Sequence, residues 1–391
     1  MARPLWEVAD VIRIAGSKFW DGVGKTVSWA QVKVLKAIVC CRTAALGGHR
    51  DRCTCCGHEQ ITFHSCRNRH CPKCQINARE KWLRKRQQEL LPVEYFHIIF
   101  SVPHGLIPII WQNKKLVLSL LFQTTAATLM EVAADPKRLG VEIGFLCILH
   151  TWGQTLQRHP HIHCVMPGGG LSPDHTRWIS SQRRFFLPVK VLSAEFRKKF
   201  LESLKQAHCD NKLSFRGKCA PLADSNAFAR FLDPFSKQKW VVYAKPPFGG
   251  AEHVLQYLAR YTHRVAISNH RLLSVDQSGV TFQWRDYTHD RAQRMMTLSC
   301  EKFLQRFLWH VLPKGLPRIR YFGWLANRRR GKLLPLCRTL LNQPAPAAND
   351  PYAAQCAKCP RCQGRLIIVE QLRAVQTMSS AYRRGYALDS S

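Results

Sequence analysis

Two histidines separated by one aliphatic residue, His161 and His163, are of a type and spacing that can bind a metal ion. They lie in the stretch RHPHIHCVMPGGG, residues 158–170, where we predict an apolar strand. Side chains two residues apart in a strand project from the same face, so both imidazoles could ligate one ion while Ile162 points into the core. The triplet alone is not specific, because strand histidines are commonly ordinary polar residues.

A pair of tyrosines, Tyr257 and Tyr261, supplies a second candidate for chemistry. The segment 250–271 has the apolar spacing of an amphipathic helix, and residues four apart share a helix face, so both hydroxyls could face one site. An aromatic stripe packed on a sheet would have the same pattern. Together with the histidines, however, the pair predicts one reaction, in which a tyrosine hydroxyl attacks a phosphodiester while a divalent ion polarises the phosphate. Two arginines of the same segment could bind phosphates, namely Arg260 and Arg264.

The charge of the chain indicates the substrate class. Its 59 Lys and Arg outnumber its 25 Asp and Glu, which gives a formal net charge of +34, and the excess runs along the whole length. A nucleic-acid phosphate backbone is the commonest partner of such a surface. The N-terminus lacks a signal-peptide pattern, and the apolar stretch 116–130 is too short and too polar to span a bilayer. We therefore expect an intracellular, DNA-binding protein with no membrane segment.

The spacing of the cysteines predicts a zinc module near the N-terminus. Among 17 cysteines, two Cys-x2-Cys pairs lie fourteen residues apart, and such pairs bind zinc as thiolates; the predicted ligands are Cys53, Cys56, Cys71 and Cys74. Nearby spare ligands are Cys55, Cys66 and His70. We expect the module to be a folding device that also presents basic residues to DNA, including Arg67 and Arg69.

A second cysteine group follows the Pro- and Ala-rich linker 342–351 near the C-terminus. It comprises Cys356, Cys359 and Cys362, which are additional candidate zinc ligands. Three cysteines do not complete a tetrahedral site, and Cys337 could supply the fourth ligand. A frayed tail without metal is the alternative.

In this order and spacing, the motifs resemble those of the rolling-circle transposases of the insertion sequence 91 family, which belong to the wider group of HUH (His-hydrophobe-His) endonucleases. The resemblance covers nearly the whole chain. The stretches that carry it are LGGHRDRCTCCGH, SCRNRHCPKCQ, HTWGQTLQRHPHIHCVMPGGG, YLARYTHRVAIS and VLPKGLPRIRYFGWLANRRR. The extra Cys55 in CTCC departs from the expected zinc motif.

The resemblance implies an α+β fold, with an HUH-nuclease-type antiparallel sheet, packed helices, a small N-terminal zinc-binding domain and a basic C-terminal tail. The expected domains are 1–92, 93–330 and 331–391, and the strands include 94–102, 144–152, 161–168 and 239–245. We expect a basic helix at 77–91.

The implied mechanism is nicking and rejoining of single-stranded element ends through a 5′-phosphotyrosine. His161 and His163 would hold Mg²⁺ or Mn²⁺, with His253 or Gln154 as the third ligand, and Tyr257 and Tyr261 would be the nucleophiles. Structural Zn²⁺ would occupy the N-terminal module. A plasmid replication initiator or relaxase, or a non-catalytic zinc-dependent DNA-binding protein, remains the alternative.

Overall fold

A computed structural model of the chain describes residues 4–245, 253, 265–287, 290–343 and 358–375. The N-terminal part contains α1 (Val8–Asp21), α2 (Trp29–Cys40), β1 (Gly48–Cys53), β2 (Glu59–Phe63) and α3 (Pro72–Gln87). The middle contains β3 (Tyr95–Ser101), α4 (Ile107–Gln112), α5 (Lys114–Ala134), β4 (Gly144–Trp152), β5 (Arg158–Pro167), β6 (Gly169–Leu171), β7 (Trp178–Ser180), α6 (Val189–Cys209), α7 (Ser225–Lys237) and β8 (Val242–Lys245). The last part contains β9 (Leu272–Val275), β10 (Val280–Asp286), β11 (Ala292–Leu298), α9 (Cys300–Trp309), β12 (Ile319–Gly323), α10 (Asn327–Leu340) and β13 (Leu366–Leu372).

A five-stranded sheet, ordered β12-β4-β5-β3-β8, forms the centre of the molecule, and its neighbouring strands are all antiparallel. Every residue of β4 is buried, which matches its largely apolar sequence. The mixed helices and antiparallel sheet confirm the expected α+β class. The strands expected at 94–102, 144–152, 161–168 and 239–245 correspond to β3, β4, β5 and β8.

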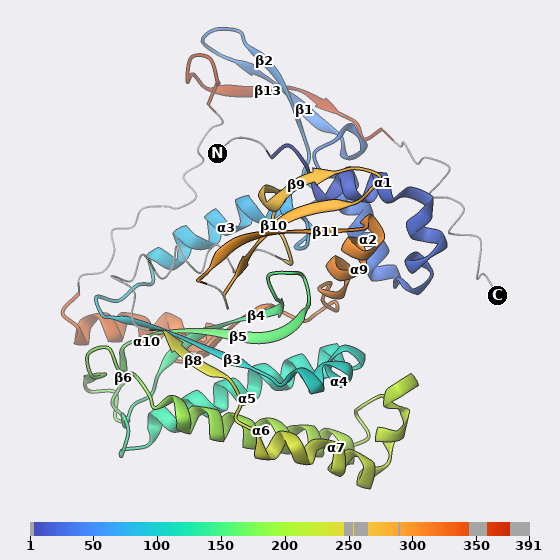
Figure 1. The fold of residues 1–391 in the computed structure, drawn as a ribbon. Coiled ribbons are helices and arrows are strands. Elements are labelled where there is room, and N and C mark those ends of the chain that lie inside the picture. The colour runs from blue at the N-terminus through green and yellow to red at the C-terminus, as the bar shows by residue number, and fades with distance from the viewer. Residues whose placement is uncertain (1–3, 246–252, 254–264, 288–289, 344–357, 376–391) are drawn as a thin grey trace.

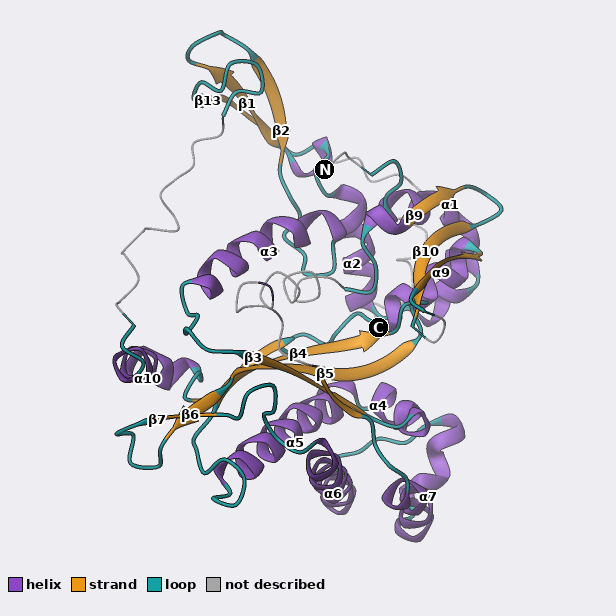
Figure 2. Cartoon of the chain, turned by 60° about the vertical axis from the view of Figure 1, so that its left-hand side comes forward, coloured by secondary structure: helices purple, strands orange, loops and turns teal. Residues whose placement is uncertain are grey.

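Helices α4, α5, α6 and α7 cover one face of this sheet, and α3 lies over the other (Figure 2). Strand alternation sends Ile162, Cys164 and Met166 of β5 into the core beneath α5 and α6. The opposite face carries His161 and His163. The largest hydrophobic core therefore packs against the face of β5 opposite His161 and His163 and fixes the position of the strand.

Helix α5 includes the apolar stretch 116–130, which we expected to be a buried helix. Among the described residues it is the one helix long and apolar enough to cross a membrane, and 61% of the apolar window is buried inside the protein. A core helix of a globular protein has the same properties. Its contacts with α6 and with strands β5 and β12 account for its composition.

A second core joins the two N-terminal helices to the segment that follows residue 265. Helix α1 packs against α2, β9 and α9, and strands β9, β10 and β11 form a separate antiparallel sheet beside them (Figure 1). Val265, Ala266 and Ile267 are fully buried in this core, as is Leu156 from the connection between β4 and β5. The N-terminal helices are thus packed against a later part of the chain.

The hairpin of β1 and β2 projects from the rest of the molecule and is completed by β13 (Figure 1). β13 pairs antiparallel with β1, from Gly48 opposite Leu372 to Cys53 opposite Leu366. Strand β13 therefore completes the N-terminal sheet, although it lies in the expected C-terminal tail. The expected boundary at residue 330 also lies inside α10. A boundary drawn along the sequence could not anticipate a strand that returns from the C-terminus.

We expect Gly144→Ala to destabilise the protein. Gly144 of β4 is opposite Gly323 of β12, and a methyl group at Gly144 would collide with the Trp324 indole, which is 1% exposed. Overpacking of this kind costs about 1–3 kcal/mol. Gly331→Ala is the matched control, because a methyl group in that helix would have no heavy atom within 4 Å. Thermal unfolding should show a lower midpoint for Gly144→Ala only, and equal midpoints would contradict this packing.

Candidate metal centres and active site

Three histidines converge on one face of the central sheet. His161 and His163 project from β5, and His150 of β4 is directly opposite His161 in the strand register. One ring nitrogen of each histidine lies within 4.8 Å of the others. All three are buried, with exposed fractions of 2% for His150, 9% for His161 and 5% for His163. The predicted pair on β5 therefore shares its face, and a third imidazole completes a potential metal site.

Hydrogen bonds from outside the trio orient two of the rings. His161 Nδ1 lies 2.7 Å from the His159 carbonyl oxygen. A carbonyl only accepts, so Nδ1 carries the proton and Nε2 of His161 keeps its lone pair for a metal. His97 of β3 has its Nε2 2.8 Å from His163 Nδ1. A neighbour of this kind fixes the orientation of a ligating imidazole.

The environment keeps these imidazoles neutral. Burial, together with the neighbouring His159, lowers the pKa of His161 to about 3. Burial is also the main reason that the pKa of His163 is well below its usual value, with His150 and His161 adding to the effect. Burial and then Lys245 lower the pKa of His97 to about 3. Neutral imidazole is the form that binds metal ions, so the site is ready for a cation near neutral pH.

The third histidine of the trio is neither of the two residues that we expected as a third ligand. His253 is exposed, and Gln154 lies beyond the end of β4, where its backbone carbonyl accepts a 2.6 Å hydrogen bond from Arg271. His150 lies with His161 and His163 instead. Sequence reasoning missed it because its place depends on strand register. The short β4–β5 connection is the signal that could have located it, since a tight hairpin pairs the last residues of one strand with the first of the next.

The two predicted nucleophiles, Tyr257 and Tyr261, lie outside the described residues, as do Arg260 and Arg264. The described ends of their segment can be located. Lys245, the last residue of β8, is opposite His97 in the register of β3 and β8. Val265 is fully buried in the second core. Lys245 is thus opposite the histidine whose ring contacts His163.

Four cysteines form a first cluster where α2 ends and α3 begins. The cluster comprises Cys41, Cys66, Cys71 and Cys74. The Cys74 sulfur is 3.5 Å from both Cys41 Sγ and Cys66 Sγ. Zinc–sulfur bonds of about 2.3 Å place the sulfurs of a tetrahedral site about 3.8 Å apart, so four thiolates in this arrangement fit Zn²⁺.

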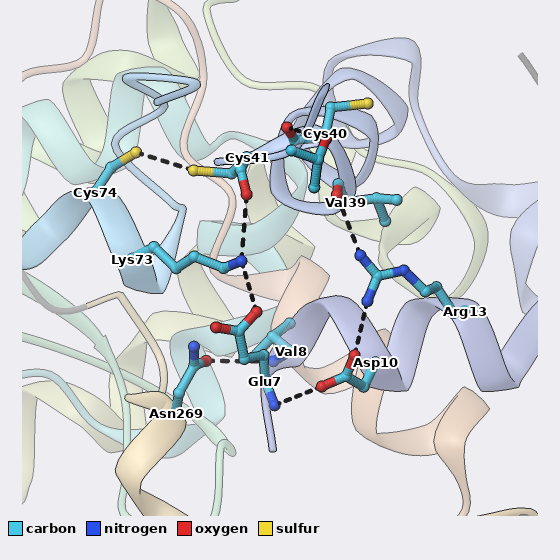
Figure 3. Close-up of polar contacts among 11 residues, drawn as sticks. Glu7, Val8, Asp10, Arg13, Val39, Cys40, Cys41, Lys73, Cys74 and Asn269 are labelled. Atoms are coloured by element: carbon cyan, nitrogen blue, oxygen red, sulfur yellow. Dashed lines mark hydrogen bonds and ion pairs between the residues drawn. The ribbon is translucent and has the colours of Figure 1, made fainter. Parts of the chain in front are cut away.

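Lys73, between the last two ligands of this cluster, connects the zinc site to helix α1 (Figure 3). Its ammonium donates to the Cys41 carbonyl at 3.2 Å and forms an ion pair of 2.6 Å with Glu7. The next residue, Val8, donates its backbone N–H to Asn269 at 3.2 Å. The first cluster therefore stabilises the junction between the N-terminal helices and the second core.

A second cluster joins the two ends of the chain and comprises Cys53, Cys56, Cys359 and Cys362. The Sγ atoms of Cys53 and Cys362 lie 3.4 Å apart, and those of Cys56 and Cys359 lie 3.6 Å apart. Backbone N–H groups of Cys56 and Cys55 lower the pKa of the Cys53 thiol to about 6, which favours the thiolate.

The two halves of this second cluster have the same backbone turn. Cys53 donates its N–H to the His58 carbonyl, and Gly57 donates to the Cys53 carbonyl. In the C-terminal half, Cys359 donates to Gly364 and Gln363 donates to Cys359. Gly57 and Gln363, the residues after each second cysteine, both have a left-handed φ, of 70° and 61°. Repeated turns of this kind point the amides toward sulfur on both sides of one tetrahedral ion.

These clusters correct the predicted zinc ligand set. The two Cys-x2-Cys pairs do not share one site, because Cys71 and Cys74 lie with Cys41 and Cys66, whereas Cys53 and Cys56 lie with the C-terminal pair. The spare ligands Cys66, Cys359 and Cys362 all take places in the clusters. Cys356 lies outside the described residues, Cys55 is exposed, and Cys337 is buried in a separate core with Trp324. Spacing identified the pairs, but only the tertiary fold decides which pairs meet.

Two other expected residues have structural contacts. His70 accepts the Leu312 backbone N–H at 3.3 Å, and burial lowers its pKa to about 3. It is not a member of the metal clusters found among the described residues. Arg69 donates to the carbonyls of Leu312, Pro313 and Leu316. These bonds hold the loop after α9 in place, whereas Arg67 is exposed and has a left-handed φ of 52°.

We expect the zinc content of the protein to show whether it has two zinc sites or one. The wild-type protein should contain two zinc ions, and Cys359→Ser with Cys362→Ser should lose one of them, because the second cluster would keep only two thiolates. Cys71→Ser with Cys74→Ser should lose the other. Elemental analysis of purified variants measures this directly. Unchanged zinc in the C-terminal double variant would contradict the second site.

The comparisons with known proteins agree with this architecture. Residues 144–332 match a family described as "Putative transposase", and residues 11–102 match the "Transposase zinc-binding domain" of IS91-type elements. The chain is 50% identical to the "Putative transposase y4qJ" of Sinorhizobium fredii, over 95% of this chain and 96% of that protein. It is 27% identical to the "Transposase for insertion sequence element IS801" of Pseudomonas savastanoi pv. phaseolicola, over 86% of this chain and 83% of that protein. No solved structure matches the chain significantly. The fold, the cysteine clusters and these relatives together show that the chain belongs to the insertion sequence 91 family of transposases.

Proposed function

We propose that this transposase nicks and rejoins single-stranded DNA at element ends, with a divalent ion at His150, His161 and His163 and with Tyr257 and Tyr261 as nucleophiles. The observation that carries the proposal is the trio of buried imidazoles on one sheet face, in which burial lowers the pKa values of His161 and His163. Bound there, a divalent cation would polarise the scissile phosphate and offset the charge that develops on it.

The donor set supports Mn²⁺ over Mg²⁺, although the sequence was compatible with both. Mg²⁺ prefers oxygen ligands in a nearly octahedral shell, whereas imidazole nitrogens suit transition-metal ions better. Three histidines supply three nitrogens and leave the other positions to phosphate oxygens and water. Mn²⁺ should therefore support cleavage at lower concentrations than Mg²⁺.

The tyrosines perform the covalent step. The hydroxyl oxygen of Tyr257 or Tyr261 forms a bond to phosphorus as the bond to the 3′ oxygen breaks, and that oxygen takes up a proton. The products are a 5′-phosphotyrosine and a free 3′-hydroxyl. Attack by a 3′-hydroxyl on the phosphotyrosine reverses the step, so joining uses the conserved bond energy and needs no ATP. Two tyrosines would let the enzyme hold one end while it cuts another.

The described ends of the tyrosine segment support this arrangement. Lys245 lies one residue before the segment and is opposite His97, whose ring contacts His163. The other end is anchored in the second core at Val265.

The zinc clusters support a structural role next to this chemistry. One fastens the N-terminal helices to the second core, and the other holds β13 against β1. Because the chain has a net charge of +34, the zinc clusters would also keep basic surfaces in a fixed position for binding single-stranded DNA. A replication initiator or relaxase would share the cleavage step. Joining of two element ends is the product that distinguishes the transposase.

The His150→Ala variant tests the trio. Its cleavage rate at limiting Mn²⁺ should fall about 10–100-fold, because a metal site with two imidazoles binds the ion more weakly than one with three. His159→Ala is the control, since its exposed side chain lies outside the trio while its carbonyl still accepts from His161. Cleavage should be measured as a function of Mn²⁺ concentration. If the cleavage rate of His150→Ala depends on Mn²⁺ concentration as that of the wild type does, the third ligand is a different residue.

A further inference from the structure

Two cations and two indole rings gather at the end of the central sheet next to the histidine trio. They are Trp111 of α4, Lys114 of α5, Arg158 of β5 and Trp309 of α9. The Arg158 guanidinium carbon lies 4.1 Å from the Trp309 ring centroid and 5.4 Å from that of Trp111. Lys114 Nζ lies 5.6 Å from the Trp111 centroid and donates to the Trp309 carbonyl at 3.0 Å. The indoles thus hold the guanidinium in a fixed position.

Among the described residues, this positive charge has no matching anion. Among the ion pairs of the described residues, none involves Lys114 or Arg158. Within the described part of the structure, Arg158 Nε and Trp111 Nε1 are buried and have no hydrogen-bond partner. Burial, and then Arg158, lower the pKa of Lys114 to about 8. Buried N–H donors without acceptors and buried cations without a counter-ion are costly, so this cluster favours a ligand that supplies anionic acceptor oxygens.

The position of the cluster connects it with the trio. Arg158 is opposite Trp152 in the register of β4 and β5, and the Trp152 ring stacks on His150 with centroids 4.6 Å apart. The register shifts between His150 and Trp152, so β5 contains a bulge at this point. Bulges redirect side chains next to functional sites. His310 continues the row of rings, with its centroid 6.0 Å from Trp152 and 6.5 Å from Trp111.

We propose that Trp111, Lys114, Arg158 and Trp309 form a phosphate subsite that binds the backbone of the DNA single strand beside the scissile phosphate. Guanidinium and ammonium groups donate several hydrogen bonds to phosphate oxygens, and the free N–H groups of this cluster supply such donors. The subsite rests on the proposed function and adds to it the residues that position the strand along the sheet. Its ligand is a phosphodiester, so it recognises the backbone and not the bases.

Single-strand binding in EDTA tests the subsite without any cleavage. Binding of a fluorescently labelled oligodeoxynucleotide to the full chain should be measured by anisotropy at several salt concentrations. Arg158→Gln should weaken binding about tenfold, as expected for one lost charged hydrogen bond. It should also reduce the slope of log K against log salt by about 0.7, as for one lost phosphate contact. Lys114→Gln should have the same kind of effect.

Arg320→Gln is the matched control. Arg320 also stacks on an aromatic ring, 4.3 Å from the Phe122 centroid, but it points to α5 and bonds to Ser119. It should bind DNA like the wild type. Arg158→Lys keeps the charge, so its salt slope should stay at the wild-type value while its affinity falls. This second variant keeps the test informative if Arg158→Gln folds poorly.

Wild-type affinity and salt slope in Arg158→Gln and Lys114→Gln would overturn the subsite, and so would a loss confined to duplex DNA. Because metal and tyrosines take no part in the assay, its outcome is independent of cleavage. A protein that binds through Arg158 but never forms an adduct would refute the proposed function and retain the subsite.

Discussion

Replacing both His161 and His163 by alanine is expected to abolish cleavage of single-stranded element ends while leaving DNA affinity within about twofold of the wild type. The trio would keep only His150, and one imidazole does not hold a divalent ion at a catalytic site. Loss of the ion removes several kcal/mol of charge stabilisation from the transition state, a factor on the order of 10³ or more in rate. Affinity depends mainly on Lys and Arg contacts with phosphates, which the double variant retains.

The control for this double variant replaces two exposed histidines, His104 and His159. It removes the same number of imidazoles outside the trio and should cleave normally. His97→Ala should give an intermediate loss of about 10–100-fold, because His97 orients His163 without binding the ion itself. Cleavage by the His161 and His163 double variant at the wild-type rate would mean that these histidines are ordinary strand residues.

The second large effect concerns the tyrosines. Tyr257→Phe and Tyr261→Phe each remove one hydroxyl and keep the ring, so packing is nearly preserved while nucleophilicity is lost. If both tyrosines act, each single variant should fail to transpose in a cell-based assay, and the double variant should form no covalent adduct. Each single variant should still cleave one element end.

Wild-type transposition by either single variant would show that its tyrosine only packs against the protein, and the two-nucleophile mechanism would then be wrong. Tyr243→Phe is a suitable control. Tyr243 lies in β8 just before the same segment, and its side chain is 53% exposed. Loss of transposition in this control would indicate a general sensitivity of the region to tyrosine replacement.

Much of the catalytic sheet could be predicted from the sequence because its strands have local signals. The strands β3 and β4 have long apolar runs, and β5 has the alternation that places His161 and His163 together. The helix α3 was also predictable from its run of basic, helix-forming residues, and the buried helix α5 from its long apolar stretch. These features depend on residues that are close in the chain.

Contacts between distant residues explain what the sequence did not reveal. His150 joins the trio through the pairing of β4 with β5, and a shift of one residue would have turned it to the opposite face. Cys359 and Cys362 reach Cys53 and Cys56 across about three hundred residues because β13 pairs with β1. Cys-x2-Cys spacing predicts half of a zinc site but does not specify its partner.

The most direct test of the account is to incubate the wild-type protein with a single-stranded element end and Mn²⁺ and to separate the products by denaturing electrophoresis. The account predicts a protein–DNA adduct that survives denaturation, with the 5′ phosphate attached to a peptide containing Tyr257 or Tyr261. The released strand should have a free 3′-hydroxyl. Cleavage without an adduct, an adduct on another residue, or no reaction at all would contradict it.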